Sequence, residues 1–184
     1  MKKVLLILLC SLLVTSMYAQ KVNFTVTSNG SFVNAENRNS YAILSVPGMS
    51  AEELYYAFLI TLRNKCVNSS GQMDVVENKA INLYDFESNL KVGSIWTAQF
   101  DGYVYYRLLL QFKDGMVRIE SPIVSRFGKN GTTYHYTFEY MLKVLQLFKE
   151  DGSPRKEKHI ITINNNINDE LNSIIDTALN VYKW

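Results

Sequence analysis

The sequence predicts an α+β protein in which an antiparallel sheet carries two main helices on one face. Apolar residues recur at helical spacing in one segment near the start of the chain and in another at its C-terminal end. Between them, several segments alternate apolar and polar residues, as strands of a half-buried sheet do. Asp-Gly dipeptides at 101–102 and 114–115 separate three of these strands, and this dipeptide favours two-residue hairpins. We therefore predict a three-stranded antiparallel meander at the centre of the sheet.

The first residues have the composition of a secretory signal peptide. Lys2 and Lys3 precede a short apolar run, and small residues follow that run. We expect residues 1–19 to be a signal peptide and residues 20–184 to be a single exported domain, either periplasmic or secreted. Lipid attachment at Cys10 is the alternative, and the apolar sequence that continues after this cysteine disfavours it.

Charge and cysteine content narrow the function. The chain has 19 basic and 17 acidic residues, so it is neutral once the two leader lysines are removed. A neutral domain lacks the basic surface of a nucleic-acid-binding protein. After the leader, no apolar stretch is long enough for stable membrane insertion. Once the leader with Cys10 is removed, Cys66 is the only cysteine left, and it is expected to be a small buried residue rather than a reactive thiol. His135 and His159 have no metal-ligand spacing, so we expect no metal. We also expect no cofactor and a monomer.

Ser50 begins the first predicted helix. The segment "VPGMSAEELYYAFL" places Ser50 three residues before Glu53, which is the spacing of a capping box. Met49 and Leu54 occupy the two positions of a hydrophobic staple. The alternative, a serine-nucleophile elbow, needs a glycine two residues after the serine, and position 52 is Glu. The sequence therefore predicts a capped helix and no nucleophile at Ser50.

Strands are predicted on both sides of this helix. The predicted strand segments are 22–27, 41–46, 71–78, 79–88, 94–100, 103–113 and 116–124, with a polar loop at 28–40. Residues 127–137 are predicted to be a loop, and residues 138–148 a short additional helix, for which a strand is the alternative. Residues 149–158 are predicted to be a solvated loop. The last helix is predicted over residues 168–184, with Asn168 as its N-cap.

Several of these segments resemble a known family. They are the leader ending "YAQ", the helix entry "VPGMSAEELYYAFL", the hairpin "RLLLQFKDGMVRI" and the last helix ending in Trp184. The chain resembles a family of exported Bacteroidetes proteins, a domain of unknown function with a TATA-binding-protein-like fold. The resemblance covers residues 40 to 184 and implies a curved antiparallel sheet with helices on one face. It implies no catalytic or binding residues.

The two predicted turns define a register and two sheet faces. With both turns in place, Phe100 pairs with Tyr103, Ala98 with Tyr105, Trp96 with Arg107, Lys113 with Met116 and Gln111 with Arg118. The predicted core face carries Ile95, Val104, Tyr106, Leu108, Leu110, Phe112, Val117, Ile119 and Ile123. The opposite face mixes aromatic and charged residues, among them five candidate binding residues: Trp96, Tyr103, Tyr105, Arg107 and Arg118. Trp, Tyr and Arg are enriched in interface hot spots, and in this register Arg107 stacks on Trp96.

Two alternatives stay open for the second face. It is a recognition surface if it is exposed, and a second core if residues 127–150 or the N-terminal strand cover it. The first alternative favours an exported, non-catalytic module that binds an unknown protein or a component of the cell envelope. Stacking aromatic rings would also suit a small ligand or a glycan. A hydrolase with dispersed groups is a further alternative, and its candidate residues are Asp85, Glu87, Glu120 and His135.

Overall fold

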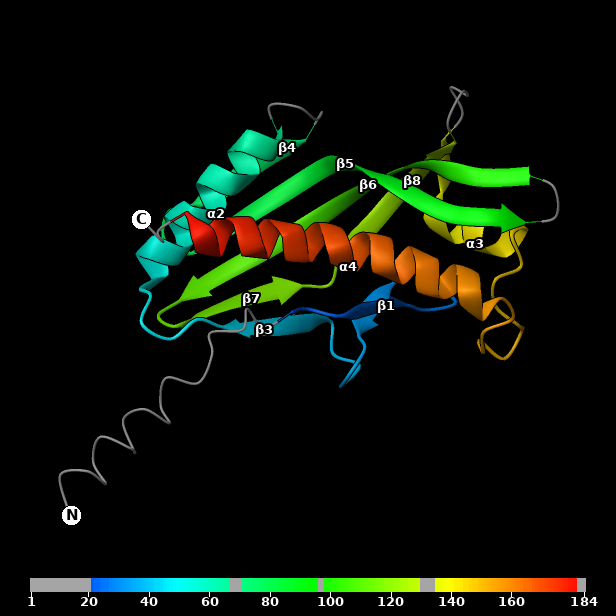
Figure 1. The fold of residues 1–184 in the computed structure, drawn as a ribbon, viewed down its shortest axis with the longest axis horizontal. Coiled ribbons are helices and arrows are strands. Elements are labelled where there is room, and N and C mark those ends of the chain that lie inside the picture. Colours follow the sequence, from blue (N-terminus) through cyan, green and yellow to red (C-terminus); the bar gives the residue numbers. More distant parts are fainter. Residues whose placement is uncertain (1–20, 67–70, 96–97, 130–134, 182–184) are drawn as a thin grey trace, which may run out of the picture.

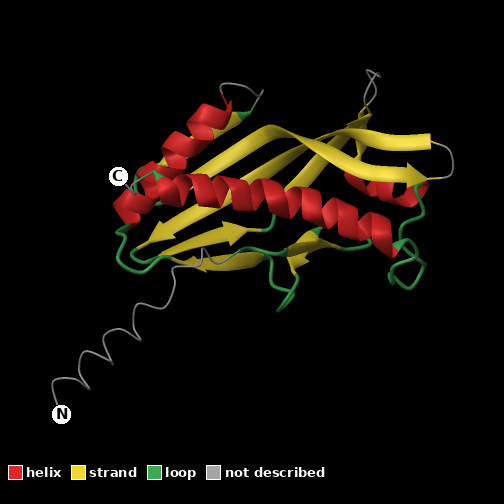
Figure 2. Cartoon of the chain, in the orientation of Figure 1, coloured by secondary structure: helices red, strands yellow, loops and turns green. Residues whose placement is uncertain are grey.

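The computed structural model describes residues 21–66, 71–95, 98–129 and 135–181 of the 184-residue chain. Figure 1 labels the elements along the chain, and Figure 2 separates helices from strands. The strands are β1 (Phe24–Val26), β2 (Phe32–Asn34), β3 (Tyr41–Ser45), β4 (Gln72–Val76), β5 (Ala80–Ile95), β6 (Ala98–Lys113), β7 (Met116–Glu120), β8 (Ile123–Lys129) and β9 (His135–Thr137). The helices are α2 (Ala51–Cys66), α3 (Phe138–Val144) and α4 (Glu157–Asn180). None of the helices in these described ranges is long and apolar enough to cross a membrane.

The main sheet is a curled, entirely antiparallel half-barrel. Its strand order is β3-β7-β6-β5-β4, while β8 also pairs with β6 and β9 pairs with β8. β7 and β8 lie end to end along one side of β6, because β7 pairs with residues 110–113 of β6 and β8 pairs with residues 102–107. β1 and β2 form a separate two-stranded sheet. The predicted α+β class, with an antiparallel sheet and two main helices on one face, is confirmed (Figure 1).

The first helix begins as the capping box predicts. The backbone N–H of Ser50 donates to Glu53 Oε2 at 2.7 Å, and the backbone N–H of Glu53 donates to Ser50 Oγ at 3.2 Å. The bond from the Ser50 N–H, followed by one from the Ser50 hydroxyl to Glu53 Oε2 at 2.9 Å, lowers the pKa of the Glu53 carboxyl below its ordinary value. Leu54 is buried and Met49 packs against the core, as a hydrophobic staple requires. Ser50 is therefore a structural residue at a helix start.

The core lies between the sheet and the two long helices. Alternate residues of β6 are buried, and Val104, Tyr106, Leu108 and Leu110 are each at most 1% exposed. The predicted core face is confirmed for the residues from Val104 to Ile119 and is wrong for Ile123, which is 61% exposed. The side chain of Ile95 is outside the described part of the chain. Ile123 follows Ser121 and Pro122, where the strand is interrupted between β7 and β8, and such an irregularity moves later side chains to the other face.

The predicted turn at Asp101-Gly102 is wrong. Both residues lie inside β6, where Asp101 pairs with Lys91 and Gly102 with Leu90. β5 continues up to Ile95, and β6 begins at Ala98, which pairs with Ile95. The predicted pairs of Phe100, Ala98 and Trp96 with residues 103, 105 and 107 are therefore wrong as well. The second turn, at Asp114-Gly115, is confirmed by the pairs Lys113–Met116 and Gln111–Arg118.

Other element boundaries also differ from the prediction. The loop predicted at 28–40 contains β2, and the loop predicted at 127–137 contains the end of β8 and all of β9. The additional helix predicted at 138–148 is present over Phe138–Val144 as α3. α4 begins at Glu157, eleven residues earlier than predicted from Asn168, and so includes the last two residues of the loop predicted at 149–158.

Asn168 is not a helix cap but a buried residue in the middle of α4. Its side-chain Oδ1 accepts the backbone N–H of Phe24 at 2.8 Å, and its Nδ2 donates to the Phe24 carbonyl at 2.9 Å. Asn164 and Asn172, one turn away on either side, accept the N–H groups of Val26 and Val22, each at 2.9 Å. A helix rises about 6 Å in four residues and a strand about 6.6 Å in two, so the two spacings match. These three asparagines form an asparagine row that holds β1 against α4.

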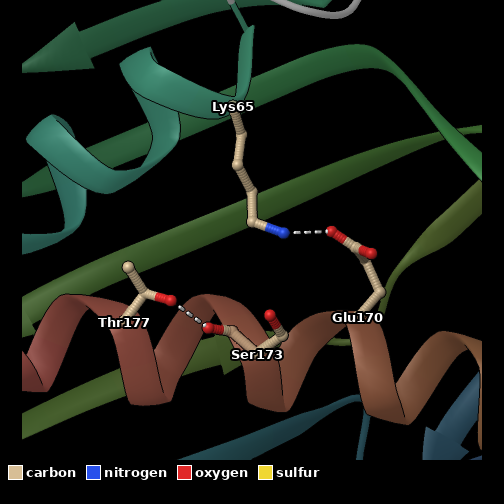
Figure 3. Close-up of polar contacts among 4 residues, drawn as sticks. All are labelled: Lys65, Glu170, Ser173 and Thr177. Carbon is tan, nitrogen blue, oxygen red and sulfur yellow. Dashed lines mark hydrogen bonds and ion pairs between the residues drawn. The ribbon is translucent and has the colours of Figure 1, made fainter.

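α2 and α4 are joined by an ion pair on their polar sides. Lys65 Nζ lies 2.6 Å from Glu170 Oε1, as Figure 3 shows. In the same view, the Thr177 hydroxyl donates to the Ser173 carbonyl within α4 at 2.7 Å. Tyr106 lies buried beneath the helices, and burial raises the pKa of its hydroxyl well above the ordinary value. The ion pair between Lys65 and Glu170 therefore joins α2 to α4.

Candidate functional site

The face of the sheet opposite α2 and α4 is exposed to solvent. α4 and α2 both lie on the other side of the sheet (Figure 1). Along β6, the side chains of Arg107 and Gln111 are exposed, and those of Tyr103, Tyr105 and Leu109 are half-buried. The two segments that could have covered this face border it at one edge and leave Arg107 and Gln111 exposed. β1 packs on α4, and α3 packs beside β8 and β9. The alternative of a second buried core is therefore wrong.

Three arginine–tyrosine pairs run across this open face. The Arg118 guanidinium on β7 lies 4.1 Å from the ring centre of Tyr41 on β3. The Arg126 guanidinium on β8 lies 4.6 Å from the ring centre of Tyr105 on β6. These distances are within the range of cation–π contacts, which are worth about 0.5 to 1 kcal/mol at exposed sites.

The third pair is Arg107 on β6 with Tyr84 on β5, at 5.1 Å. Arg107 Nε also donates to Asn82 Oδ1 at 2.9 Å. Tyr103 joins the group through an edge-to-face contact with Tyr105 at 5.6 Å. We name this surface the arginine–tyrosine platform; it consists of Tyr41, Tyr84, Tyr103, Tyr105, Arg107, Arg118 and Arg126. Its rings and guanidinium groups are held in place by one another before any ligand arrives.

Four of the five predicted binding residues lie on the platform. Tyr103, Tyr105 and Arg107 are on β6, and Arg118 is on β7. Trp96 is outside the described residues, so its predicted stacking with Arg107 is outside them too. Arg107 does make a contact of the predicted type, but its aromatic partner is Tyr84. The predicted surface is thus present, although the strand pairing that led to it differs.

Three platform residues were missed from the sequence. Tyr41 belongs to the platform because β3 pairs with β7, and Arg126 belongs to it because β8 pairs with the first half of β6. Tyr84 lies on β5, which was expected to end before the meander. Alternation within each strand would have indicated the face of each residue. The choice of neighbouring strands was the missing information, because it depends on contacts between segments far apart in the chain.

Gly128 brings β8 close to the platform residue Tyr103. Tyr103 pairs across the strands with Gly128, and a Cβ at Gly128 would overlap the Tyr103 ring. On the other side of β6, Tyr105 pairs with Glu87. Partial burial, followed by the hydrogen bond and the charge of Glu87, raises the pKa of Tyr105 above its ordinary value. The Tyr105 hydroxyl therefore stays protonated at neutral pH and is oriented by a carboxylate.

A cleft of about 610 Å³ lies at one edge of the open face. We name it the edge cleft. Its lining residues are Asn29–Phe32, Ser40, Arg107, Leu109, Glu120–Ser125 and Thr137–Glu139. One wall is the junction of β7 and β8, and the other is built by the β1–β2 turn and the start of α3. Arg107 belongs both to the edge cleft and to the platform.

The carboxylates proposed for a hydrolase have structural partners. Glu120 forms an ion pair with Arg118 at 2.8 Å, and the Glu87 carboxylate accepts a hydrogen bond from the Tyr105 hydroxyl. The side chains of Asp85 and His135 are outside the described part of the chain. In the described ranges, no three His, Cys, Asp or Glu side chains are placed to hold a metal ion.

No protein-family model matches the chain, and no curated protein matches it. Its fold is similar to that of a DUF4468 family protein from Bacteroides ovatus, with a TM-score of 0.56 and 14% identity over 75% of this chain and 83% of that one. It is also similar to a TBP-like protein from Parabacteroides distasonis, with a TM-score of 0.53 and 13% identity over 76% of this chain and 91% of the other. The chain therefore has the TATA-binding-protein-like α+β fold of Bacteroidetes proteins of unknown function, as the sequence resemblance implied.

Proposed function

We propose that the chain is an exported, non-catalytic interaction module that binds a protein or another component of the cell envelope on the arginine–tyrosine platform. The observation that carries the proposal is that three arginine–tyrosine pairs, half-buried or exposed, lie on the sheet face opposite α2 and α4. Arginine and tyrosine dominate interface hot spots, because they combine a large contact area with directed hydrogen bonds.

The platform is suited to binding because its members are already ordered. Each guanidinium lies over a ring, so little conformational entropy is lost when a partner covers the pair. Tyr105 and Arg126 are at its centre and are neighbours across β6 and β8. Both side chains lie outside the core, so their loss is expected to weaken binding while leaving the fold intact.

The test compares Tyr105→Ala and Arg126→Ala with Asn165→Ala, a control at an exposed position of α4 on the opposite side. Each protein is immobilised and used to capture partners from an envelope extract of the source organism. Truncation of a hot-spot residue costs about 1 to 3 kcal/mol, which is about a 5- to 150-fold loss of affinity. We expect this loss for the two platform variants, no loss for the control, and unchanged melting temperatures. Equal capture by all three variants contradicts the proposal.

Export is tested separately. The full chain is expressed in a Bacteroidetes host, and the N-terminal sequence of the protein is determined in the periplasmic and culture fractions. We expect a mature N-terminus near Gln20. A cytoplasmic protein that keeps residues 1–19, or a lipid on Cys10, contradicts the expectation.

A glycan is the second candidate ligand, favoured by the half-buried rings of Tyr103 and Tyr105 side by side on the open face. Binding of an oligosaccharide panel to the same variants distinguishes it from a protein partner. A platform-dependent signal with a purified oligosaccharide, retained after protease treatment of the extract, would identify a glycan.

A further inference from the structure

The row of strands beside β7 and β8 is incomplete. β3 pairs with β7 from Ser45–Met116 to Tyr41–Glu120, and β9 pairs with β8 from Arg126–Thr137 to Gly128–His135. Between these two partners, the edge at residues 121–125 faces no strand among the described residues. The last bond on the β3 side is the Ser121 N–H donating to the Ser40 carbonyl at 2.8 Å.

The gap in this row is hollow. It coincides with the edge cleft, which has a volume of about 610 Å³. Six consecutive residues, Glu120–Ser125, line one wall of this cleft. Five strand residues span about 17 Å at 3.4 Å each, which is the length of an extended peptide of about five residues. Pockets of several hundred Å³ are large enough for ligands of that kind. A strand segment of about five residues therefore matches this stretch of the edge in length.

The charges around the edge cleft favour an acidic occupant. Its two carboxylates are both neutralised, Glu120 by Arg118 at 2.8 Å and Glu139 by Lys143 at 2.7 Å. Arg107 has only neutral neighbours among the described residues, the Asn82 amide oxygen and the Tyr84 ring. One uncompensated positive charge therefore remains at the cleft, beside the backbone edge and beside the exposed side chain of Ile123, which pairs with Arg107.

We propose that the edge cleft binds an extended peptide segment with an acidic side chain, which adds a short strand along residues 122–125 between β3 and β9. Backbone hydrogen bonds to the sheet edge supply affinity in this mode of recognition, and side-chain contacts supply selectivity. The acidic side chain pairs with Arg107, and an apolar side chain of the peptide contacts Ile123. The inference goes beyond the proposed function, because it names a different surface and the class of its occupant.

The experiment uses the mature chain and three fluorescent pentapeptides. The first is acetyl-Val-Asp-Val-Asp-Val-amide, the second has Asn in place of Asp, and the third is the Asp peptide with alternate backbone nitrogens methylated. Binding is measured by fluorescence anisotropy, and backbone amide shifts of residues 123–125 are followed by NMR. We expect the Asp peptide to bind about tenfold more tightly than either of the others, since one charge pair and the strand hydrogen bonds each contribute at least that factor.

Three variants place the peptide. Arg107→Gln removes the cleft charge, and Ile123→Glu adds an acid at an exposed position beside it; both are expected to weaken binding of the Asp peptide about tenfold or more. Arg63→Gln, at an exposed position of α2 that does not line the edge cleft, is expected to leave binding unchanged. Equal affinity for the Asp and Asn peptides, undiminished binding of the methylated peptide, or full competition by acetate alone overturns the proposal. These outcomes leave the envelope-capture test unaffected, because that test uses Tyr105 and Arg126, which do not line the cleft.

Discussion

The two Asp-Gly dipeptides of the central strands have the same sequence and opposite structural roles. At Asp114-Gly115 the chain reverses, and Gly115 has a φ of +72°. At Asp101-Gly102 the chain continues within a sixteen-residue strand, near its start, and Gly102 has no positive φ. Gly115 is needed for its backbone conformation. Gly102 is needed because it has no side chain, which leaves space for the neighbouring strand. A local turn signal alone does not distinguish these two requirements.

The surroundings of each dipeptide explain the difference. The turn at 114–115 is attached to the start of α2: the Asp114 carboxylate accepts the Ala51 N–H at 2.8 Å, and the Gly115 N–H donates to the Met49 carbonyl at 2.8 Å. At Gly102, strands lie on both sides, with Leu90 opposite on β5 and Lys129 opposite on β8. A strand with partners on both edges satisfies its backbone hydrogen bonds without turning. The pairing of β6 with β5 and β8 thus overrides the local preference for a turn.

The largest expected effect is that of Gly102→Ala. A Cβ at this position would overlap the carbonyl oxygen of Gly128 and lie 2.8 Å from the Phe127 ring. The overlapping atom belongs to the backbone, so β6 and β8 must separate, which costs about 3 kcal/mol or more. Chemical denaturation measures the loss of unfolding free energy. A variant as stable as the parent protein would show that β8 does not approach Gly102 this closely.

Asn168→Leu tests whether contacts with a distant segment, rather than helix capping, determine the role of Asn168 in α4. The change removes the hydrogen bonds to the Phe24 N–H and carbonyl and leaves both groups buried, at an expected cost of about 2 to 4 kcal/mol. Asn165→Leu, at an exposed position of the same helix, is the matched control and should stay near the parent value. If Asn168 only capped a helix, its replacement would instead cost about 1 kcal/mol, and the Phe24 amide would keep its slow hydrogen exchange.

Gly115→Ala is expected to destabilise the protein by only about 1 to 2 kcal/mol. The nearest atom to a new Cβ is the Val46 carbonyl oxygen at 4.0 Å, so the expected effect comes from the positive φ and not from a clash. Gly115→Asn should recover part of the loss, because asparagine tolerates this conformation better than alanine does. The same Asn replacement at Gly102 should recover nothing. Recovery at both sites would remove the distinction between the two glycines.

The smallest effect is expected at the helix entry that the 114–115 turn contacts. Ser50→Ala removes the side-chain cap of α2, which is worth about 1 kcal/mol, while Asp114 still accepts the Ala51 N–H. Urea denaturation at neutral and at acidic pH measures the change.

The pH dependence of Ser50→Ala has a definite sign. The pKa of Glu53 is lowered in the folded protein, so its contribution is present above the unfolded pKa and is lost as pH falls through the folded pKa. The difference between Ser50→Ala and the parent should therefore shrink in acid, and in the variant the pKa of Glu53 should move back toward its ordinary value. An NMR titration in which the pKa of Glu53 is the same in both proteins contradicts this account.

The sequence by itself determined the features whose interactions join residues only a few positions apart. The Ser50–Glu53 box, the Asp114-Gly115 turn and the apolar stripe of α4 were all predictable, because their hydrogen bonds and spacings are local. The alternation along β6 and β7 also indicated which side chains face the core. Four of the five predicted binding residues lie on the open face for this reason.

Only the tertiary structure decided which distant segments meet. The pairing of Ile95 with Ala98 and the interruption at Ser121-Pro122 both depend on how long β5, β6 and β8 remain paired. The asparagine row depends on β1, more than 130 residues away in the chain, matching the rise of α4. Tyr41, Tyr84 and Arg126 reach the platform because of strand order, and the edge cleft exists because β3 and β9 end short of each other. In each of these arrangements, hydrogen bonds and burial between distant segments outweigh a local backbone preference. This stabilisation arises only when the whole sheet has formed.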